Sequence, residues 1–199
     1  DARRQNSPDH FGSSTGPQVA DAAVEQLLAE VVEEALPQPA RIYGELFGTG
    51  AIVTGGASGL GRAIALELAR HGVHIAFNYL DNGDGRMQDA AERTVRELRQ
   101  MQVTVVCRPC DVRDAEAVNA FVAEADNALA GLHILVNNAG IARDRALWRM
   151  EDDEWRDVLE TNLTGAFNMI RAISPIVRAQ QHGKIVNVAS VHGLRSEFG

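Results

Sequence analysis

The sequence predicts an α/β protein built on a doubly wound parallel sheet, and three observations support this. Short apolar runs alternate with longer helical stretches from residue 50 onward. Each run is apolar at successive positions, which is typical of strands buried on both faces of a parallel sheet. The first run continues directly into a glycine-rich turn and then a helix. Such a chain forms one sheet between two helix layers, with a ligand crevice where the strand order reverses.

The N-terminal part predicts a helical extension ahead of this sheet. Residues 1–17 are rich in Ser, Gly and Pro and lack apolar periodicity, which indicates a flexible leader. Residues 18–49 hold an acidic amphipathic helix, from about Val19 to Leu36, and a linker in which two prolines end the helix. We expect the helix to pack on its own domain or on a second subunit, and docking onto another protein stays open as the alternative.

The alternating part, residues 50–199, predicts five strands and the helices between them. Each strand is expected where an apolar run is bounded by turn residues, and each helix where apolar residues recur every three or four positions. The predicted strands are Ala51–Thr54, Val73–Tyr79, Val103–Cys107, Leu132–Asn137 and Lys184–Ala189. The predicted helices are Leu60–His71, Met87–Met101, Ala115–Ala130 and a pair at Glu151–Glu160 and Thr161–Gln180.

Composition and charge exclude several classes of function. The 199 residues are 45% hydrophobic and 23% charged, which is average for a globular domain with a real core. The net charge of -8, without a basic stripe, argues against nucleic-acid binding. No stretch approaches the roughly 20 apolar residues of a membrane helix, and the first residues lack the apolar run of a signal peptide, so we expect a cytoplasmic protein without membrane contact.

The two cysteines, Cys107 and Cys110, form a Cys-x-x-Cys pair. Such a pair is half of a zinc site at most, no second pair exists, and the six histidines are scattered. We therefore expect both thiols to pack as small hydrophobic groups and expect no metal.

The glycine-rich turn spans Thr54 to Gly61, between the first strand and the first helix. In this context Gly55 allows a tight turn, and Gly59 allows the backbone to approach a pyrophosphate closely. Gly61 allows the helix to pack on the strand, while the amides at the helix start face the anion. The turn therefore predicts a dinucleotide-binding unit.

With its Thr-Gly-x-x-x-Gly-x-Gly spacing, this turn resembles that of the short-chain dehydrogenase/reductase family. Further motifs follow in the family's order after the third, fourth and fifth strands and within the helix pair. They are Asp111-Val112, Asn137-Asn138-Ala139-Gly140, Asn162 in Thr-Asn-Leu-Thr-Gly, and Ser190. The resemblance implies a Rossmann-like NAD(P)-binding domain over residues 50–199, holding the front five strands of the family's domain and incomplete at its C-terminal end.

The resemblance also implies roles for particular residues. Asp111 accepts a hydrogen bond from the adenine amino group and the Val112 amide meets a ring nitrogen, while Ser190 binds the substrate carbonyl oxygen and Asn162 holds a water in a proton relay. The expected catalytic residues are Ser190 and Asn162. The expected cofactor-binding residues are Gly55, Ala57, Ser58, Gly59, Leu60, Gly61, Asn78, Tyr79, Asp111, Val112, Asn138, Ala139 and Gly140.

In the family the general acid is a tyrosine in a Tyr-x-x-x-Lys motif further along the chain than the serine, where the lysine cation lowers the phenol pKa. The 199 residues end at Gly199, before that motif, and neither Tyr43 nor Tyr79 has a lysine four residues later. We expect the chain to be the front part of an active oxidoreductase that interconverts a carbonyl and an alcohol, and to be inactive by itself. The alternative is a catalytically incomplete chain that binds a nucleotide or a partner.

The sequence favours NADP over NAD as the cofactor. The second strand closes with Asn78-Tyr79-Leu80, without the carboxylate that binds the ribose hydroxyls of NAD, and Asp81 falls late. Against this, Ser58 stands where many NADP-dependent relatives carry a basic residue, so NAD stays open. The amino-acid sequences of the motifs resemble those of reductases that act on 3-oxoacyl thioesters or small ketones.

The helix pair predicts a homodimer or homotetramer. Apolar side chains recur among polar ones along it, and members of the family often associate through this pair. These side chains are Trp155, Leu159, Leu163, Phe167 and Ile170. The alternative is that they only cover the sheet.

Overall fold

The computed structural model of the chain describes residues 44–193. These residues belong to one compact unit. The predicted leader and the predicted acidic helix lie outside the described residues.

The centre of the unit is a sheet of five parallel strands in the order β3-β2-β1-β4-β5. The order reverses between β1 and β4, because β1 pairs with β2 on one side and with β4 on the other. The carboxyl ends of these strands therefore open a crevice at the point where ligands bind in doubly wound sheets. The strands are β1 Gly50–Val53, β2 His74–Tyr79, β3 Val105–Pro109, β4 Ile134–Asn137 and β5 Lys184–Asn187.

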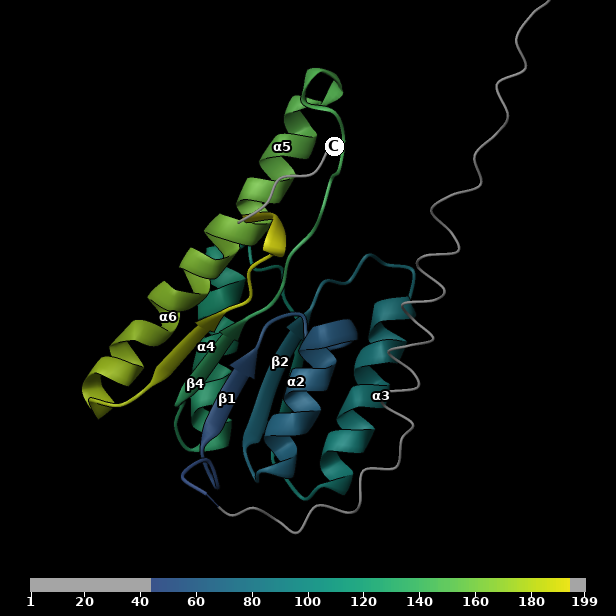
Figure 1. Ribbon diagram of the computed structural model, residues 1–199. Helices are drawn as coiled ribbons and strands as arrows, with labels where there is room; N and C mark the ends of the chain where they lie inside the picture. The colour runs from purple at the N-terminus through teal and green to yellow at the C-terminus, as the bar shows by residue number, and fades with distance from the viewer. Residues whose placement is uncertain (1–43, 194–199) are drawn as a thin grey trace, which may run out of the picture. The chain divides into compact units, whose positions relative to one another are not determined.

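Helices cover both faces of the sheet, as Figure 1 shows. Two of them, α2 and α3, lie on one face, and α4 and α6 lie on the other. The helices are α2 Gly59–Arg70, α3 Arg86–Gln100, α4 Ala115–Leu129, α5 Asp152–Leu159 and α6 Gly165–Gln180. Short helical turns occur at η1 Leu147–Arg149, η2 Glu160–Thr164 and η3 Val191–Gly193. The predicted α/β class, with a doubly wound parallel sheet, is confirmed.

The core divides into two halves because successive side chains of a strand point to opposite faces. Val53 and Phe77, which are register partners on β1 and β2, pack under α2 and α3. Their neighbours Ile52 and Ala76, also partners, pack under α4 and α6 on the other face. All four are fully buried, so β1 and β2 are the apolar centre predicted from their continuous hydrophobic runs.

The predicted helix pair forms one helical path with a change of winding in the middle. Figure 1 shows α5 and α6 nearly in line. Between them η2 is a π-helical turn, so the hydrogen-bond pattern widens there without a break in the helix. Such π turns are rare and often occur at functional sites. This one contains Asn162.

Each of the five strands differs from the sequence prediction by one or two residues at one or both ends, and two of these differences have a clear structural reading. β3 begins two residues later than predicted, because Gln102 adopts a left-handed φ of 61° and the chain joins the sheet only at Val105. β5 ends at Asn187 rather than Ala189, so Ser190 lies in the loop after the strand. Within the described part of the chain β5 is one of the two edge strands of the sheet, and its residues are exposed.

Among residues 44–193 no helix is both long and apolar enough to cross a membrane.

Candidate functional site

Two clefts open at the carboxyl ends of the strands. The first has a volume of about 590 Å³ and lies over β1, β2 and β3. All the predicted cofactor-binding residues except Ala57 and Gly59 line it. The side chain of Ala57 is instead buried under α3, where the Ala57 carbonyl accepts a hydrogen bond from Thr94.

The glycine turn forms the part of this cleft nearest to α2. Gly59 has a left-handed φ of 54°, and a Cβ added there would point into open space. Gly61 is enclosed: a Cβ there would clash with the Asn138 side-chain nitrogen and with the Gly55 carbonyl oxygen. Among the residues described, no side-chain cap occupies the start of α2, because Ser58 makes no capping hydrogen bond. The first amides of α2 are therefore available to an anion.

Asn78, at the end of β2, has its side chain committed to the protein. Its Nδ2 donates to the Cys110 carbonyl at 2.7 Å, and its Oδ1 accepts from the Gly55 amide at 3.3 Å. The residue is only 2% exposed. It therefore holds the glycine turn and the loop after β3 in place, and its neighbour Tyr79 contributes the adjacent wall of the cleft.

Asn138 and Thr54 join the start of the glycine turn to the loop after β4. The Thr54 hydroxyl accepts hydrogen bonds from the amides of Asn138 and Ala139, at 2.9 and 2.8 Å. In return, Asn138 Nδ2 donates to the Thr54 carbonyl at 2.9 Å. The loop Asn138–Gly140 is thereby fixed beside β1, where the two clefts meet.

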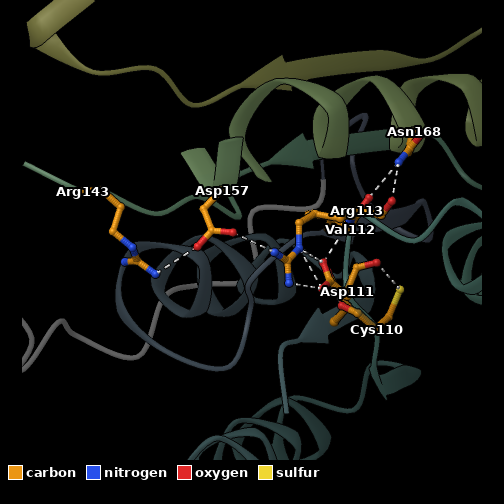
Figure 2. A network of polar contacts seen from close by, with 8 residues as sticks. Cys110, Asp111, Val112, Arg113, Arg143, Asp157 and Asn168 are labelled. Carbon is orange, nitrogen blue, oxygen red and sulfur yellow. Dashed lines mark hydrogen bonds and ion pairs between the residues drawn. The ribbon is translucent and has the colours of Figure 1, made fainter. Parts of the chain in front are cut away.

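The loop after β3 carries an ion-pair network, drawn in Figure 2. Arg113 Nη2 lies 2.7 Å from the Asp111 carboxylate, and Arg113 Nη1 lies 3.4 Å from that of Asp157 on α5. Arg143 reaches the same Asp157 carboxylate at 3.8 Å. The hydrogen bonds from Arg113 hold the pKa of Asp111 below its ordinary value. Asp111 is therefore an ionised acceptor at neutral pH.

Helix α6 supports this loop from the other face of the sheet. Asn168, which is 5% exposed, donates from Nδ2 to the Val112 carbonyl at 3.0 Å and to the Arg113 carbonyl at 3.3 Å (Figure 2). Gly165 approaches Val112 so closely that a Cβ would lie 2.5 Å from Val112 Cγ2. The backbone of the loop is therefore fixed by α6, independently of the ion pairs.

The second cleft has a volume of about 850 Å³ and lies between β4, β5 and α6. Ser190 and Asn162, the two predicted catalytic residues, both line it. It shares Val112 and the residues from Asn138 to Ile141 with the first cleft. A ligand bound along the first cleft can therefore reach the second over this shared loop.

Asn162 faces the loop after β4 from the π turn. Its Oδ1 accepts from the Ile141 amide and its Nδ2 donates to the Ile141 carbonyl, both at 2.9 Å. The side chain thus pairs with the backbone as a neighbouring strand would. Asn162 therefore fixes the wall that the two clefts share, a role that the sequence did not predict.

A pair of asparagines, Asn137 and Asn187, closes the floor of the second cleft. They are register partners at the ends of β4 and β5, and Asn137 Nδ2 donates to Asn187 Oδ1 at 2.9 Å. Asn137 Oδ1 is buried and has no hydrogen-bond partner within the described part of the chain. The pair links β4 to the strand that leads to Ser190.

Tyr79 and Lys184 do not lie beside Ser190. They therefore cannot act there as a general acid and as a cation that lowers the pKa of that acid. Tyr79 lines the first cleft, and burial raises the pKa of its phenol above the ordinary value. Lys184 is the first residue of β5, at the end of the strand opposite to Ser190. Neither residue lines the second cleft.

The cysteine pair is split between the two faces of the sheet. Cys107 packs with the α2–α3 side of the core, and Cys110 with the α4–α6 side. Burial raises the pKa of each thiol to about 11. The expected packing as small hydrophobic groups is confirmed.

Sequence reasoning missed several features of the site. These are the roles of Arg113, Asp157 and Asn168, and the hydrogen bond between Asn137 and Asn187. Arg113 is two residues from Asp111, and a basic residue so close to a predicted ligand was the available signal. The other contacts join residues far apart in the sequence, so no local pattern could reveal them.

Known proteins are similar to the part of the chain that carries this site. Residues 49–199 match the family model of the short chain dehydrogenases. The chain is 41% identical, over 143 residues, to the 3-oxoacyl-acyl-carrier-protein reductase FabG of Staphylococcus aureus, covering 72% of this chain and 56% of that protein. It is 34% identical, over 145 residues, to the acetoacetyl-CoA reductase of Paracoccus denitrificans, covering 73% of this chain and 56% of that protein.

Solved structures show the same arrangement. An NAD⁺-bound xylitol dehydrogenase superposes with a TM-score of 0.72 at 30% identity, covering 78% of this chain and 58% of that one. A short chain dehydrogenase/reductase from Burkholderia phymatum in complex with NAD superposes with a TM-score of 0.72 at 33% identity, covering 78% of this chain and 54% of that one. The chain thus spans a little over half the length of the relatives that it matches. Because the family model covers most of the sequence, the chain belongs to the short-chain dehydrogenase family.

Proposed function

We propose that the chain forms the nucleotide-binding part of an NAD(P)H-dependent oxidoreductase that interconverts a carbonyl and an alcohol. One observation carries this proposal: the cleft with the glycine turn and Asp111 joins the cleft with Ser190 and Asn162 over one shared loop. The names of the two curated relatives favour a 3-oxoacyl thioester over a small ketone as the substrate.

The described residues fit a dinucleotide. The space above Gly59 is open, and the start of α2 has no side-chain cap among the residues described, so the pyrophosphate has both room and amide donors. At the other end of the cleft, Asp111 supplies an acceptor for the adenine amino group and Val112 supplies an amide. When bound, the dinucleotide supplies a hydride to the substrate's carbonyl carbon.

The chain's own residues then bind and orient the substrate. Ser190 donates a hydrogen bond to the carbonyl oxygen, where negative charge develops as the hydride arrives. Asn162 holds the loop at Ile141, which keeps the wall between nucleotide and substrate in place. The oxygen also needs a proton, for which the family resemblance assigns a tyrosine further along the chain than residue 199.

We propose NADP as the preferred cofactor. Leu80 and Asn82 line the cleft after β2, whereas Asp81 does not. Its carboxylate instead accepts a hydrogen bond from the Gly83 amide at 2.8 Å. Because it does not line the cleft, this carboxylate is poorly placed to bind ribose hydroxyls, and it repels a 2′-phosphate less than a carboxylate within the cleft would.

The test uses the protein whose sequence continues from Gly199 through the tyrosine motif. We expect this protein to oxidise NADPH in the presence of a 3-oxoacyl thioester, and Ser190→Ala to lower kcat by about 100-fold or more, the effect of removing one oxyanion donor. Affinity for NADPH should stay the same in this variant, because Ser190 lines only the second cleft. Full turnover by Ser190→Ala would refute the role of Ser190, and a preference for NADH would refute the cofactor assignment.

The second candidate function, for the 199-residue chain, is nucleotide binding without catalysis. This function is favoured because neither the described tyrosine nor the described lysine lies beside Ser190. We expect that chain to bind NADPH and to show no reductase turnover. Turnover by the 199-residue chain would show that one of its own residues supplies the proton.

We further propose that the protein is a homo-oligomer joined through the α5–α6 face. Trp155, Leu163 and Phe167 are 54%, 66% and 55% exposed on this helical path. Leu159 lies between them and is 38% exposed. They are spaced four residues apart and so form a row of apolar side chains, which a second copy of the same row would bury.

A further inference from the structure

Arg113 binds Asp111 through three separate donors. The Arg113 amide donates to Asp111 Oδ1 at 2.9 Å, which forms a tight turn in the backbone. The side chain adds Nε, which is shared between Oδ1 at 3.1 Å and Oδ2 at 2.9 Å, and Nη2, at 2.7 Å from Oδ2. The carboxylate is therefore held in one orientation by its neighbour two residues along.

Arg113 is itself held from the opposite side of the cleft. Its Nη1 reaches Asp157 on α5, whose other carboxylate oxygen lies near Arg143 on the loop after β4. The four side chains alternate in charge, and all four line the first cleft. Figure 2 shows them in a row from Asp111 to Arg143.

The loop backbone does not depend on this row. Asn168 binds the carbonyls of Val112 and Arg113 from α6, and Gly165 packs directly against Val112. Loss of the Arg113 side chain would therefore leave the Asp111 carboxylate held by the Arg113 amide alone, while the loop stays in place.

We propose that Arg113 is a positioning residue for recognition of the nucleotide base. It orients the Asp111 carboxylate so that its remaining acceptor capacity faces the 6-amino group of adenine, and Asp157 fixes Arg113 in that position. This inference rests on the proposed binding of a dinucleotide in the first cleft.

The chemistry of the carboxylate supports this assignment. An ionised carboxylate has about four lone-pair sites and only accepts hydrogen bonds. Arg113 directs three donors at them, one of which, Nε, is shared between both oxygens, so little acceptor capacity is left and its direction is fixed. The lowered pKa of Asp111, caused first by the Arg113 side chain, keeps the group ionised. Such an acceptor binds an exocyclic amine and rejects a carbonyl oxygen at the same position.

The experiment measures the preference for adenine over hypoxanthine, whose 6-oxo group cannot donate. The 199-residue chain is titrated with NADP and with its hypoxanthine analogue, and NAD and its analogue are the second pair. We expect the unmodified chain to bind the adenine form more tightly by about 10-fold or more, because a mismatched partner leaves the carboxylate unpaired. In Arg113→Met this preference should fall to about 2-fold or less.

Three further variants sharpen the result. Arg113→Lys keeps the charge without the planar fork and should lose most of the preference. Asp157→Asn weakens the hold on Arg113 and should lose part of it. Arg108→Met is the matched control. Arg108 makes a similar bidentate ion pair with Glu124, at 2.7 and 2.6 Å, but does not line the cleft. Its base preference should equal that of the unmodified chain.

The outcomes separate this inference from the proposed function. If the unmodified chain binds neither form of either dinucleotide, the proposed function fails and the inference fails with it. If the chain binds dinucleotides but has no base preference, or keeps its full preference in both Arg113→Met and Arg113→Lys, the role of Arg113 is refuted and the proposed function stands. If Arg113→Met does not fold, Arg113→Lys and Asp157→Asn decide the question by the same ratio.

Discussion

At the scale of single residues, Cys107 and Cys110 illustrate how the sheet separates neighbouring side chains. The two thiols are three residues apart, yet they pack on opposite faces of the sheet. They therefore cannot form a disulfide without disrupting the strand end. Their burial also opposes ionisation, because a thiolate is poorly solvated among apolar side chains.

This predicts slow alkylation of the native protein. At about pH 8 a thiol with a pKa of about 11 is far less ionised than an ordinary cysteine, so iodoacetamide should react on the order of 100-fold more slowly with the native chain than with the chain unfolded in guanidinium. Mass spectrometry of timed samples measures both rates. Because ionisation increases as pH rises toward the pKa, the native rate should climb steeply between about pH 8 and pH 10. Equal native and unfolded rates would contradict the burial of both thiols.

The sequence located the residues of the first cleft but not the partners of their side chains. Motif spacing placed Asn78 and Asp111 at strand ends, where nucleotide-binding residues gather. It could not show that the Asn78 side chain binds Gly55 and Cys110, because these contacts span 23 and 32 residues and depend on strand pairing. The ion pair between Arg113 and Asp157 spans 44 residues and was invisible for the same reason.

At the scale of elements, the contact between α6 and the loop after β3 supports the cleft. Gly165 is the first residue of α6, and the Val112 side chain fills the space beside it. A side chain at Gly165 would have to push the helix away from the loop that carries Asp111 and Arg113. The distance between α6 and the loop is thus set by the absence of a single Cβ.

We predict that Gly165→Ala destabilises the chain by about 1–3 kcal/mol, the usual cost of overpacking a tight contact. NADP affinity should fall as well, because Val112 lines the cleft. Urea unfolding and a nucleotide titration measure the two effects. In the double variant Gly165→Ala with Val112→Ala, the losses of stability and of affinity should each be smaller than the sum of the losses in the two single variants. The reason is that the clashing Val112 methyl group is removed. Additive losses would contradict the direct contact.

The helices were predicted better than the change of winding within them. Apolar periodicity located α5 and α6 to within a few residues, although only α6 buries apolar side chains, Met169 and Ile173, and α5 buries none. The π turn has no such signal, since it accompanies the pairing of Asn162 with the Ile141 backbone, 21 residues earlier in the chain. The end of β5 was missed because Val188 and Ala189 continue its apolar run after strand pairing stops.

At the scale of the whole molecule, the apolar row on α5 and α6 predicts association of two copies. The double variant Trp155→Glu with Phe167→Glu should dissociate the oligomer to monomers at micromolar concentration, because it places charges in the buried row. Light scattering measures the mass. Asn119→Glu adds one such charge at an exposed position on α4 and should leave the oligomer intact. A monomeric unmodified protein would contradict the proposed interface.

The order of the strands explains why the two clefts meet. The reversal between β1 and β4 places the glycine turn beside the Asn138–Gly140 loop, although the two are far apart in the sequence. The sequence predicted this crevice from the alternation of strands and helices, which is a global pattern. It could not predict the shared wall at Ile141, which depends on one asparagine from the π turn.

The central claim is that the first cleft binds a dinucleotide across the glycine turn. The most direct test is a calorimetric titration with NADPH, which measures the affinity of the 199-residue chain. The affinity of Gly59→Val is compared with that of Gly83→Val. Both glycines have a left-handed φ, of 54° and 75°, with open space around them, so both variants carry similar backbone strain. Only Gly59 lies in the turn that would hold the pyrophosphate. We predict saturable binding by the unmodified chain and by Gly83→Val, and a loss of about 10-fold or more in Gly59→Val. Equal affinity in all three proteins, or no binding by the unmodified chain, would contradict the account.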